Sequence, residues 1–218
     1  MFVSLQRRGP CCYRGLPMVK PTKKTLRSCT SKIEARPGIN DFFFSGLASC
    51  VQDLHPNLRD CCLIIDGVAL RTDLVFSEGE DLVKGFVDLG DGDRRHLPAD
   101  EALTAMVRSL YGTWKQAVCF WYTSSKLTAE DYAPLILKLI RRLLATGLRV
   151  VILITDGLAK QKLAAALLGV TTENPWFLVD NVRIYYVIDV PHQLKCLRNA
   201  ILKYNLKVKD GSVIKMMY

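Results

Sequence analysis

Three short apolar runs, each followed by an aspartate, constrain the fold of this chain more than any other feature of its sequence. Asp66 follows the run 61–65, Asp156 follows 149–155 and Asp189 follows 182–188. Short continuous apolar runs are typical of buried strands. Because ligands bind beyond the carboxyl ends of strands in open α/β sheets, these acidic ends are the first place to expect chemistry.

The alternation of strand and helix patterns predicts an α/β domain with a mixed sheet flanked by helices, preceded by a short helical N-terminal extension. The expected strands span residues 61–66, 82–89, 117–122, 149–155 and 182–188. The expected helices span residues 23–33, 41–54 (capped by Asn40), 98–111, 128–146, 159–168 and 191–204. The helix over 98–111 rests on an apolar stripe at helical spacing, formed by Leu103, Met106, Val107 and Leu110.

Charge is distributed unevenly along the 218 residues, which carry a net charge of +9. Residues 1–60 hold ten Lys or Arg against four Asp or Glu, residues 61–191 hold 14 against 16, and residues 192–218 hold six against one. Basic ends around an acidic middle suit a polyanionic partner such as nucleic acid. Ordinary solvated surface charge accounts for the same pattern equally well, so both interpretations stay open.

Asp66 and Asp156 are the candidate metal ligands. Each follows an apolar strand and precedes a glycine, and two carboxylates on adjacent strands repel each other unless a cation lies between them. Mg²⁺ is commonly held by one or two carboxylates plus substrate phosphates, and paired metals about 4 Å apart serve phosphodiester transfer. The alternative is that each aspartate caps the turn that follows it.

A second candidate region is the segment from Asp189 to Asn199. Asp189 is placed to cap a helix, and His192, Lys195 and Asn199 share one helical face, with Arg198 beside them. A basic face at a helix start suits contact with phosphate or substrate. The alternative is a capped surface helix.

Several other classes of site lack their motifs. The chain has no Walker-type or GxGxxG loop, no GxSxG and no CxxC pair, and its three histidines are scattered. Cys61, Cys62 and Cys119 lie in apolar runs and are expected to be buried free thiols of a reducing compartment. No membrane partner is expected, since the longest apolar run, 143–154, is broken by Arg149.

Several segments together resemble P-element-type transposases, the group that includes the THAP-domain transposases. These are Leu63–Leu70, Val83–Gly90, Trp114–Gln116 followed by Val118–Tyr122, Val150–Asp156 and Tyr186–Asn199. The last is the most specific, because it contains Asp189-Val-Pro-His-Gln-Leu-Lys-Cys-Leu-Arg-Asn199. The resemblance covers roughly residues 20–218.

The resemblance implies a ribonuclease-H-like fold, cut-and-paste transposition of DNA with transposon ends as substrate, and a nuclear location. It implies that Asp66 and Asp156 are the first two acids of a DDE site that holds Mg²⁺ or Mn²⁺. In the full-length family a GTP-binding insertion and a third acid, a glutamate, follow this region, and a homo-oligomer is possible there. The expected division is a basic linker and helical extension at 1–60, an incomplete core at 61–205, and the start of the missing insertion or C-terminal part at 206–218.

Some residues depart from the family pattern. Gly67 and Val68 follow the first aspartate where the family commonly has Glu-Met, Thr155 replaces a cysteine, and no THAP zinc-finger pattern is present. We therefore expect a transposase fragment that is weak or inactive as a nuclease by itself, because the third acid is missing. The alternatives are a non-enzymatic DNA- or protein-binding remnant of a transposase and a generic α/β enzyme.

Overall fold

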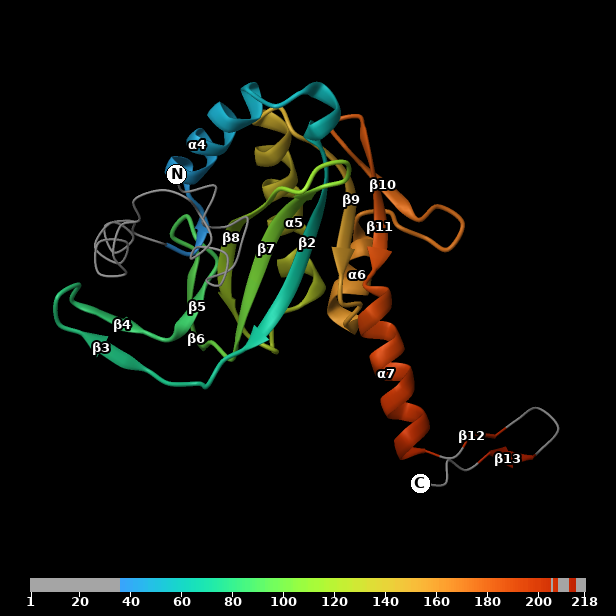
Figure 1. Ribbon diagram of the computed structural model, residues 1–218. Coiled ribbons are helices and arrows are strands. Elements are labelled where there is room, and N and C mark those ends of the chain that lie inside the picture. The colour runs from blue at the N-terminus through green and yellow to red at the C-terminus, as the bar shows by residue number, and fades with distance from the viewer. Residues whose placement is uncertain (1–35, 205, 208–211, 215–218) are drawn as a thin grey trace, which may run out of the picture.

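A mixed nine-stranded sheet is the centre of the fold (Figure 1). The computed structural model describes residues 36–204, 206–207 and 212–214. The strand order is β10-β11-β9-β2-β7-β8-β5-β6, with β1 paired to β8. The strand β2 pairs in parallel with β9 on one side and antiparallel with β7 on the other, so the sheet changes direction at its central strand.

The elements follow one another along the chain with these bounds. They are β1 Gly38–Ile39, α4 Asp41–Gln52, the 3-10 turn Pro56–Arg59, β2 Asp60–Ala69, β3 Val75–Ser77, β4 Leu82–Lys84, β5 Phe86–Asp88, β6 Arg94–Pro98, β7 Glu101–Ser109, β8 Lys115–Thr123, α5 Ala129–Ala145, β9 Arg149–Thr155, α6 Ala159–Leu167, β10 Trp176–Val179, β11 Val182–Ile188, α7 Val190–Lys203, β12 Leu206–Lys207 and β13 Val213–Ile214.

Helix α5 covers one face of the sheet and closes the core; in Figure 1 it lies behind β2 and β7. A reciprocal cap begins it, in which the Asp131 carboxylate accepts from the Thr128 backbone amide at 2.9 Å. Its apolar stripe includes Leu139, Ile140 and Leu143, all fully buried. Each such side chain contributes roughly 1.5–3 kcal/mol by leaving water.

The expected helix over 98–111 is wrong, because this segment forms β7. Leu103, Ala105 and Val107 are buried while Thr104 and Arg108 are exposed, which is the period of a strand. The apolar residues of this segment fit both periods. Pairing decides between them, because β7 binds β2 on one side and β8 on the other.

Two expected strands differ in extent. The strand β2 does not end at Asp66 but continues to Ala69, paired with β7 throughout. The expected strand 82–89 divides at Gly85 into β4, in a separate hairpin with β3, and β5, in the main sheet. Gly85 has φ +105, and a Cβ there would lie 1.9 Å from the Asp73 carbonyl oxygen, so the chain turns sharply at this point. The strands β1, β3, β6, β10, β12 and β13 were not expected.

Most other elements are confirmed within one to three residues, namely α4, β8, α5, β9, α6, β11 and α7. The Asn40 side chain caps α4 as expected, by accepting from the Phe42 backbone amide at 3.0 Å. The expected basic helix over 23–33 lies outside the described residues. Phe44 and Val51 of α4 belong to the main core, while the expected division of the chain at residue 60 stays a prediction.

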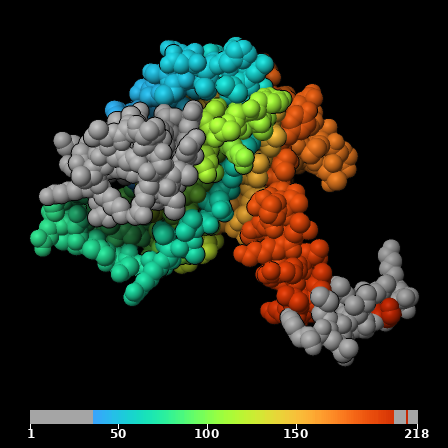
Figure 2. Space-filling view, in the orientation of Figure 1, coloured from blue at the N-terminus to red at the C-terminus, as the bar shows by residue number. Residues whose placement is uncertain are grey.

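Helix α7 leaves the sheet after β11 and extends away from the body of the molecule (Figures 1 and 2). None of its residues is buried. Among the helices that the structure describes, none has the length and apolar character needed to cross a membrane.

Candidate metal-binding edge of the sheet

Asp66 lies on the face of the sheet opposite α5. Its neighbour Ile65 is 2% exposed and belongs to the core, whereas the Asp66 side chain points the other way and is exposed. Asp66 pairs with Thr104 of β7, and the Thr104 hydroxyl donates to the Asp66 backbone carbonyl at 3.0 Å. The backbone at Asp66 is thus fixed by the sheet while its carboxylate faces solvent.

Asp156 follows the last residue of β9 directly. Its Oδ1 accepts from the Leu158 backbone amide at 3.1 Å, so the side chain caps the turn that leads to α6. Gly157, with φ +78, makes this turn possible, and a Cβ there would lie 2.6 Å from Ile188. The turn-cap interpretation is therefore correct for one oxygen of Asp156, and no hydrogen bond of the described chain occupies Oδ2.

Strand register places three aspartates in one row. Ile65 pairs with Thr155, and Thr155 pairs with Ile188. Asp66 is the next residue of β2, Asp156 and Asp189 directly follow β9 and β11, and the Asp189 amide donates to the Thr155 carbonyl at 2.8 Å. Since neighbouring strands lie about 4.8 Å apart, Asp66 and Asp156 have adjacent backbones.

A bulge between β2 and β9 sets this register. Cys61 pairs with Val150, but Cys62 pairs with Ile152, so Val151 is an extra residue on β9. From Cys62 and Ile152 onward the two strands pair residue by residue without another irregularity. Paired residues therefore lie on the same face of the sheet. Ile64 and Ile154 lie on the same open face as the aspartates that follow two residues later.

The row supplies hard oxygen donors of the kind that Mg²⁺ and Mn²⁺ prefer. Within residues 36–204 and the two short described segments, no group of three or more His, Cys, Asp or Glu side chains has a metal-holding arrangement. The geometry therefore offers two carboxylates, one on β2 and one directly after β9.

The other predicted site residues all lie on α7, which begins one residue beyond the row. His192 is half-buried, and Lys195, Arg198 and Asn199 are exposed. Arg198 donates to the Asn199 side chain at 2.9 Å. None of these four side chains hydrogen-bonds to Asp66 or Asp156. Helix α7 contacts Asp156 through Gln193, whose side-chain Nε2 donates to the Asp156 backbone carbonyl at 3.1 Å.

Sequence reasoning missed a polar cluster on the opposite, helix-covered face. Glu101 Oε2 accepts from Lys160 Nζ at 2.8 Å, from Thr123 Oγ1 at 3.0 Å and from the Tyr132 hydroxyl at 3.1 Å. The ammonium of Lys160 also lies 4.9 Å from the centre of the Tyr132 ring. Glu101 was not considered as a site residue because its segment was expected to be a helix. A strand assignment for this segment would have placed Glu101 at the start of a strand next to β2.

Burial and hydrogen bonding act in opposite directions on this cluster. Burial lowers the pKa of Lys160, but the hydrogen bonds to Glu101 and Tyr132 outweigh it, so that the pKa of Lys160 is raised overall. Burial raises the pKa of Tyr132. Lys160 therefore stays charged and Tyr132 stays neutral through the physiological range.

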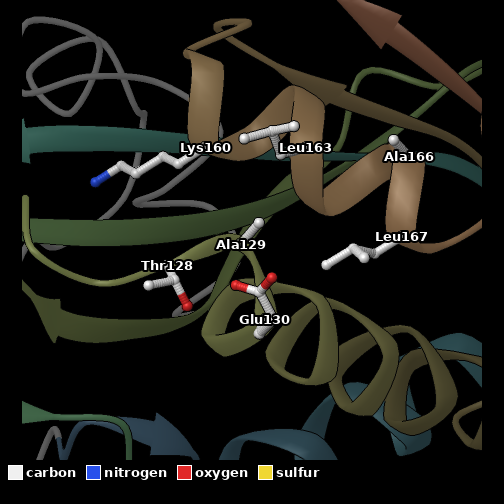
Figure 3. A pocket seen from close by; sticks show the side chains of 7 residues that line it. All are labelled: Thr128, Ala129, Glu130, Lys160, Leu163, Ala166 and Leu167. Carbon is white, nitrogen blue, oxygen red and sulfur yellow. The ribbon is translucent and has the colours of Figure 1, made fainter.

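A pocket of about 450 Å³ lies next to this cluster, between α5 and α6 (Figure 3). Glu130 from α5 and Leu167 from α6 lie on opposite sides of it, and Lys160 borders it with its ammonium pointing away. The pocket is on the helix-covered side of the sheet, so it is separate from the aspartate row.

Comparison with known proteins fits this fold. Residues 35–169 match the family model described as TNP-like, RNase H N-terminal domain. The chain belongs to this family. The match spans β2, β9 and both helices that close the core, and it ends before β10, so the ribonuclease-H-like fold expected from the sequence is confirmed.

Two curated transposases are similar to this TNP-like chain. It is 25% identical over 197 residues to human DNA transposase THAP9, covering 84% of this chain and 21% of the relative. It is 25% identical over 222 residues to the Transposable element P transposase of Drosophila melanogaster, covering 98% of this chain and 27% of the relative. The chain thus spans about a quarter of the length of these relatives.

The fold also matches a solved structure, the Drosophila P element transposase strand transfer complex. The TM-score is 0.66 at 23% identity, over 98% of this chain and 45% of that chain. This likeness concerns the fold alone, and it agrees with the RNase H N-terminal domain matched over residues 35–169.

Proposed function

We propose that this chain carries the first two metal ligands of a DDE-type DNA transposase, Asp66 and Asp156. The observation that supports the proposal most is the strand register, in which Ile65 pairs with Thr155, so that Asp66 and Asp156 are the next residues on neighbouring segments of the chain. A bound Mg²⁺ or Mn²⁺ would stabilise charge on the attacking and leaving oxygens of a phosphodiester. The chain's own part is to hold both carboxylates at fixed backbone positions.

DNA is the proposed partner, and α7 is the proposed contact for its backbone. Lys195 and Arg198 are exposed on a helix that begins beside the aspartate row (Figure 1). Basic side chains near the metal ligands suit phosphates of a strand that is held at the row. By analogy with its relatives, we propose that the protein acts in the nucleus.

Mn²⁺ binding tests the metal site. We expect the 218-residue chain to bind Mn²⁺ in an electron paramagnetic resonance titration, and expect Asp66→Asn and Asp156→Asn each to weaken it by about 10-fold or more, because each removes a charged ligand. Asp73→Asn is the matched control, an exposed aspartate outside the row, and it should bind as the unaltered chain does. Equal binding in all four proteins would refute the site.

Nuclease assays and DNA binding test the rest. We propose that the chain alone cleaves DNA weakly or not at all, since two aspartates supply only part of a DDE site. Mg²⁺-dependent cleavage abolished by Asp66→Ala would overturn that statement. DNA binding should weaken as salt rises, because basic side chains displace counterions from phosphate. Binding to DNA without Mn²⁺ binding would favour the non-enzymatic remnant instead.

A further inference from the structure

We propose that Glu101 and Lys160 form a positioning pair that fixes the separation of Asp66 and Asp156 from the far side of the sheet. The pair does not belong to the row itself: Leu103 and Ala105, two and four residues after Glu101, are buried beneath α5 on the opposite face. The inference rests on the proposed metal site, and it concerns what holds that site in shape.

The first contact joins Glu101 to the strand that carries Asp66. Glu101 pairs with Ala69 of β2 and with Thr123 of β8. A Cβ added to Gly67 would lie 2.3 Å from Glu101 Oε1 and 3.0 Å from its Cδ. The Glu101 carboxylate therefore rests directly on the backbone of Gly67, the residue after Asp66, in space that any other side chain would fill.

The second contact joins Glu101 to the turn that carries Asp156. Lys160 is the second residue of α6, four residues after Asp156, and its Nζ lies 2.8 Å from Glu101 Oε2. This turn is short and already closed by the Leu158 amide on Asp156 Oδ1. A displacement of Lys160 is therefore passed to Asp156 through four residues of constrained backbone.

Burial gives the pair its rigidity. The side chains of Lys160 and Glu101 are 19% and 15% exposed, so solvent screens their attraction less than it screens the surface pairs. The Thr123 and Tyr132 hydroxyls complete the hydrogen bonds of Glu101 Oε2. Partners behind metal ligands typically change metal affinity by 10–100-fold when they are replaced, because they orient the ligands.

Three variants test the pair through Mn²⁺ affinity of the 218-residue chain. Glu101→Gln and Lys160→Met each remove one charge, and Gly67→Ala keeps both charges while pushing the Glu101 carboxylate off β2. We expect each to weaken Mn²⁺ binding by about 10-fold or more. Lys160→Arg, which retains the positive charge, should restore much of the affinity lost in Lys160→Met.

The control is Lys84→Met, which breaks an exposed ion pair to Glu80 with an N–O distance of 2.6 Å; Mn²⁺ affinity should not change. Circular dichroism at the titration temperature checks that each variant is folded, and the Mn²⁺ resonance line shape reports altered coordination, which a loss of global stability alone would not change. If a charge variant does not fold, Gly67→Ala carries the test.

Two outcomes would contradict the proposal. If the unaltered chain binds Mn²⁺ and every folded variant binds it with the same affinity, the positioning pair is overturned alone. If the unaltered chain does not bind Mn²⁺, the metal site is overturned and the pair with it.

Discussion

Individual side chains in this sheet have environments that the sequence indicates only in part. Cys61 was expected to be a buried thiol, and it is fully buried, with the Arg149 carbonyl 3.6 Å from its sulfur. The alignment of Asp66 with Asp156 could be anticipated only as far as their places after apolar runs, because the extra residue at Val151 leaves no mark in the sequence. Glu101 could not be assigned a role at all while its strand was taken for a helix.

Thiol reactivity is the first residue-scale prediction. Burial raises the pKa of Cys61 to about 12 and also raises the pKa of Cys119, whereas Cys50 and Cys196 are exposed. Because the thiolate is the reactive form, iodoacetamide at pH 8 should label Cys50 and Cys196 well before Cys61 and Cys119. Peptide mass spectrometry at timed intervals measures this. Labelling of Cys61 as fast as Cys50 in folded protein would contradict it.

A loss of folding stability at alkaline pH is the second residue-scale prediction. The pKa of Cys61 rises from its ordinary value of 9.0 to about 12 on folding, so above pH 9 the unfolded chain loses this proton first. The free energy of unfolding should therefore be intact below pH 9 and fall as pH rises toward 12. Urea titrations across this range measure the slope, and Cys61→Val should make it shallower. An identical slope in the variant would show that Cys61 does not contribute.

At the scale of elements, strong single-period signals predicted correctly and mixed signals did not. The strand β9 and helix α5 were placed almost to the residue, because one is a short apolar run and the other has a cap, an apolar stripe and a closing glycine. The segment 101–109 satisfies both periods, and its pairing with two distant strands decided the outcome. The spacing of residues within one segment does not indicate which distant strands, here β2 and β8, will pair with it.

The cap of α5 gives an element-scale prediction. Asp131 accepts from the Thr128 amide and also pairs with Arg95 at 2.7 Å. Asp131→Ala should lower the free energy of unfolding by about 1–2 kcal/mol, because it leaves a helix-terminal amide without a partner. Lys126→Ala, an exposed change in the preceding turn, should stay within about 0.5 kcal/mol. Chemical denaturation of both variants compares them, and equal losses would exclude a special role for the cap.

At the scale of the whole molecule, the core and α7 contrast. The family match covers residues 35–169, and the core also includes buried residues of β10 and β11. Helix α7 lies beyond both and presents Val190, Leu194 and Leu197 to solvent. The amphipathic pattern correctly predicted a helix here. It could not indicate that the helix would project from the sheet, because an apolar stripe normally lies against its own domain.

Because the apolar side chains of α7 are exposed and those of the core are buried, substitutions in α7 should destabilise the protein less than substitutions in the core. Leu194→Gln and Leu197→Gln should each change the free energy of unfolding by less than about 0.5 kcal/mol, because both side chains are already exposed. Leu139→Ala, in the buried stripe of α5, should cost about 2–5 kcal/mol. Urea denaturation of the three variants measures these values. A loss above 1.5 kcal/mol for either α7 variant would mean that the stripe is covered in solution.

The bulge at Val151 sets which residue of β9 lies opposite each later residue of β2. With the bulge, Asp156 directly follows the partner of Ile65; if Val151 were instead paired opposite Cys62, every later residue of β9 would move by one position, and Asp156 would lie level with Gly67. Because side chains alternate between faces, that shift would separate the two carboxylates onto opposite sides of the sheet. Deletion of Val151, in contrast, would make Val150 and Ile152 consecutive, so that Ile152 stays opposite Cys62 and Asp156 still follows the partner of Ile65. The two acids thus share a face because Val151 is left out of the ladder, and either the bulge or the absence of that residue keeps them aligned.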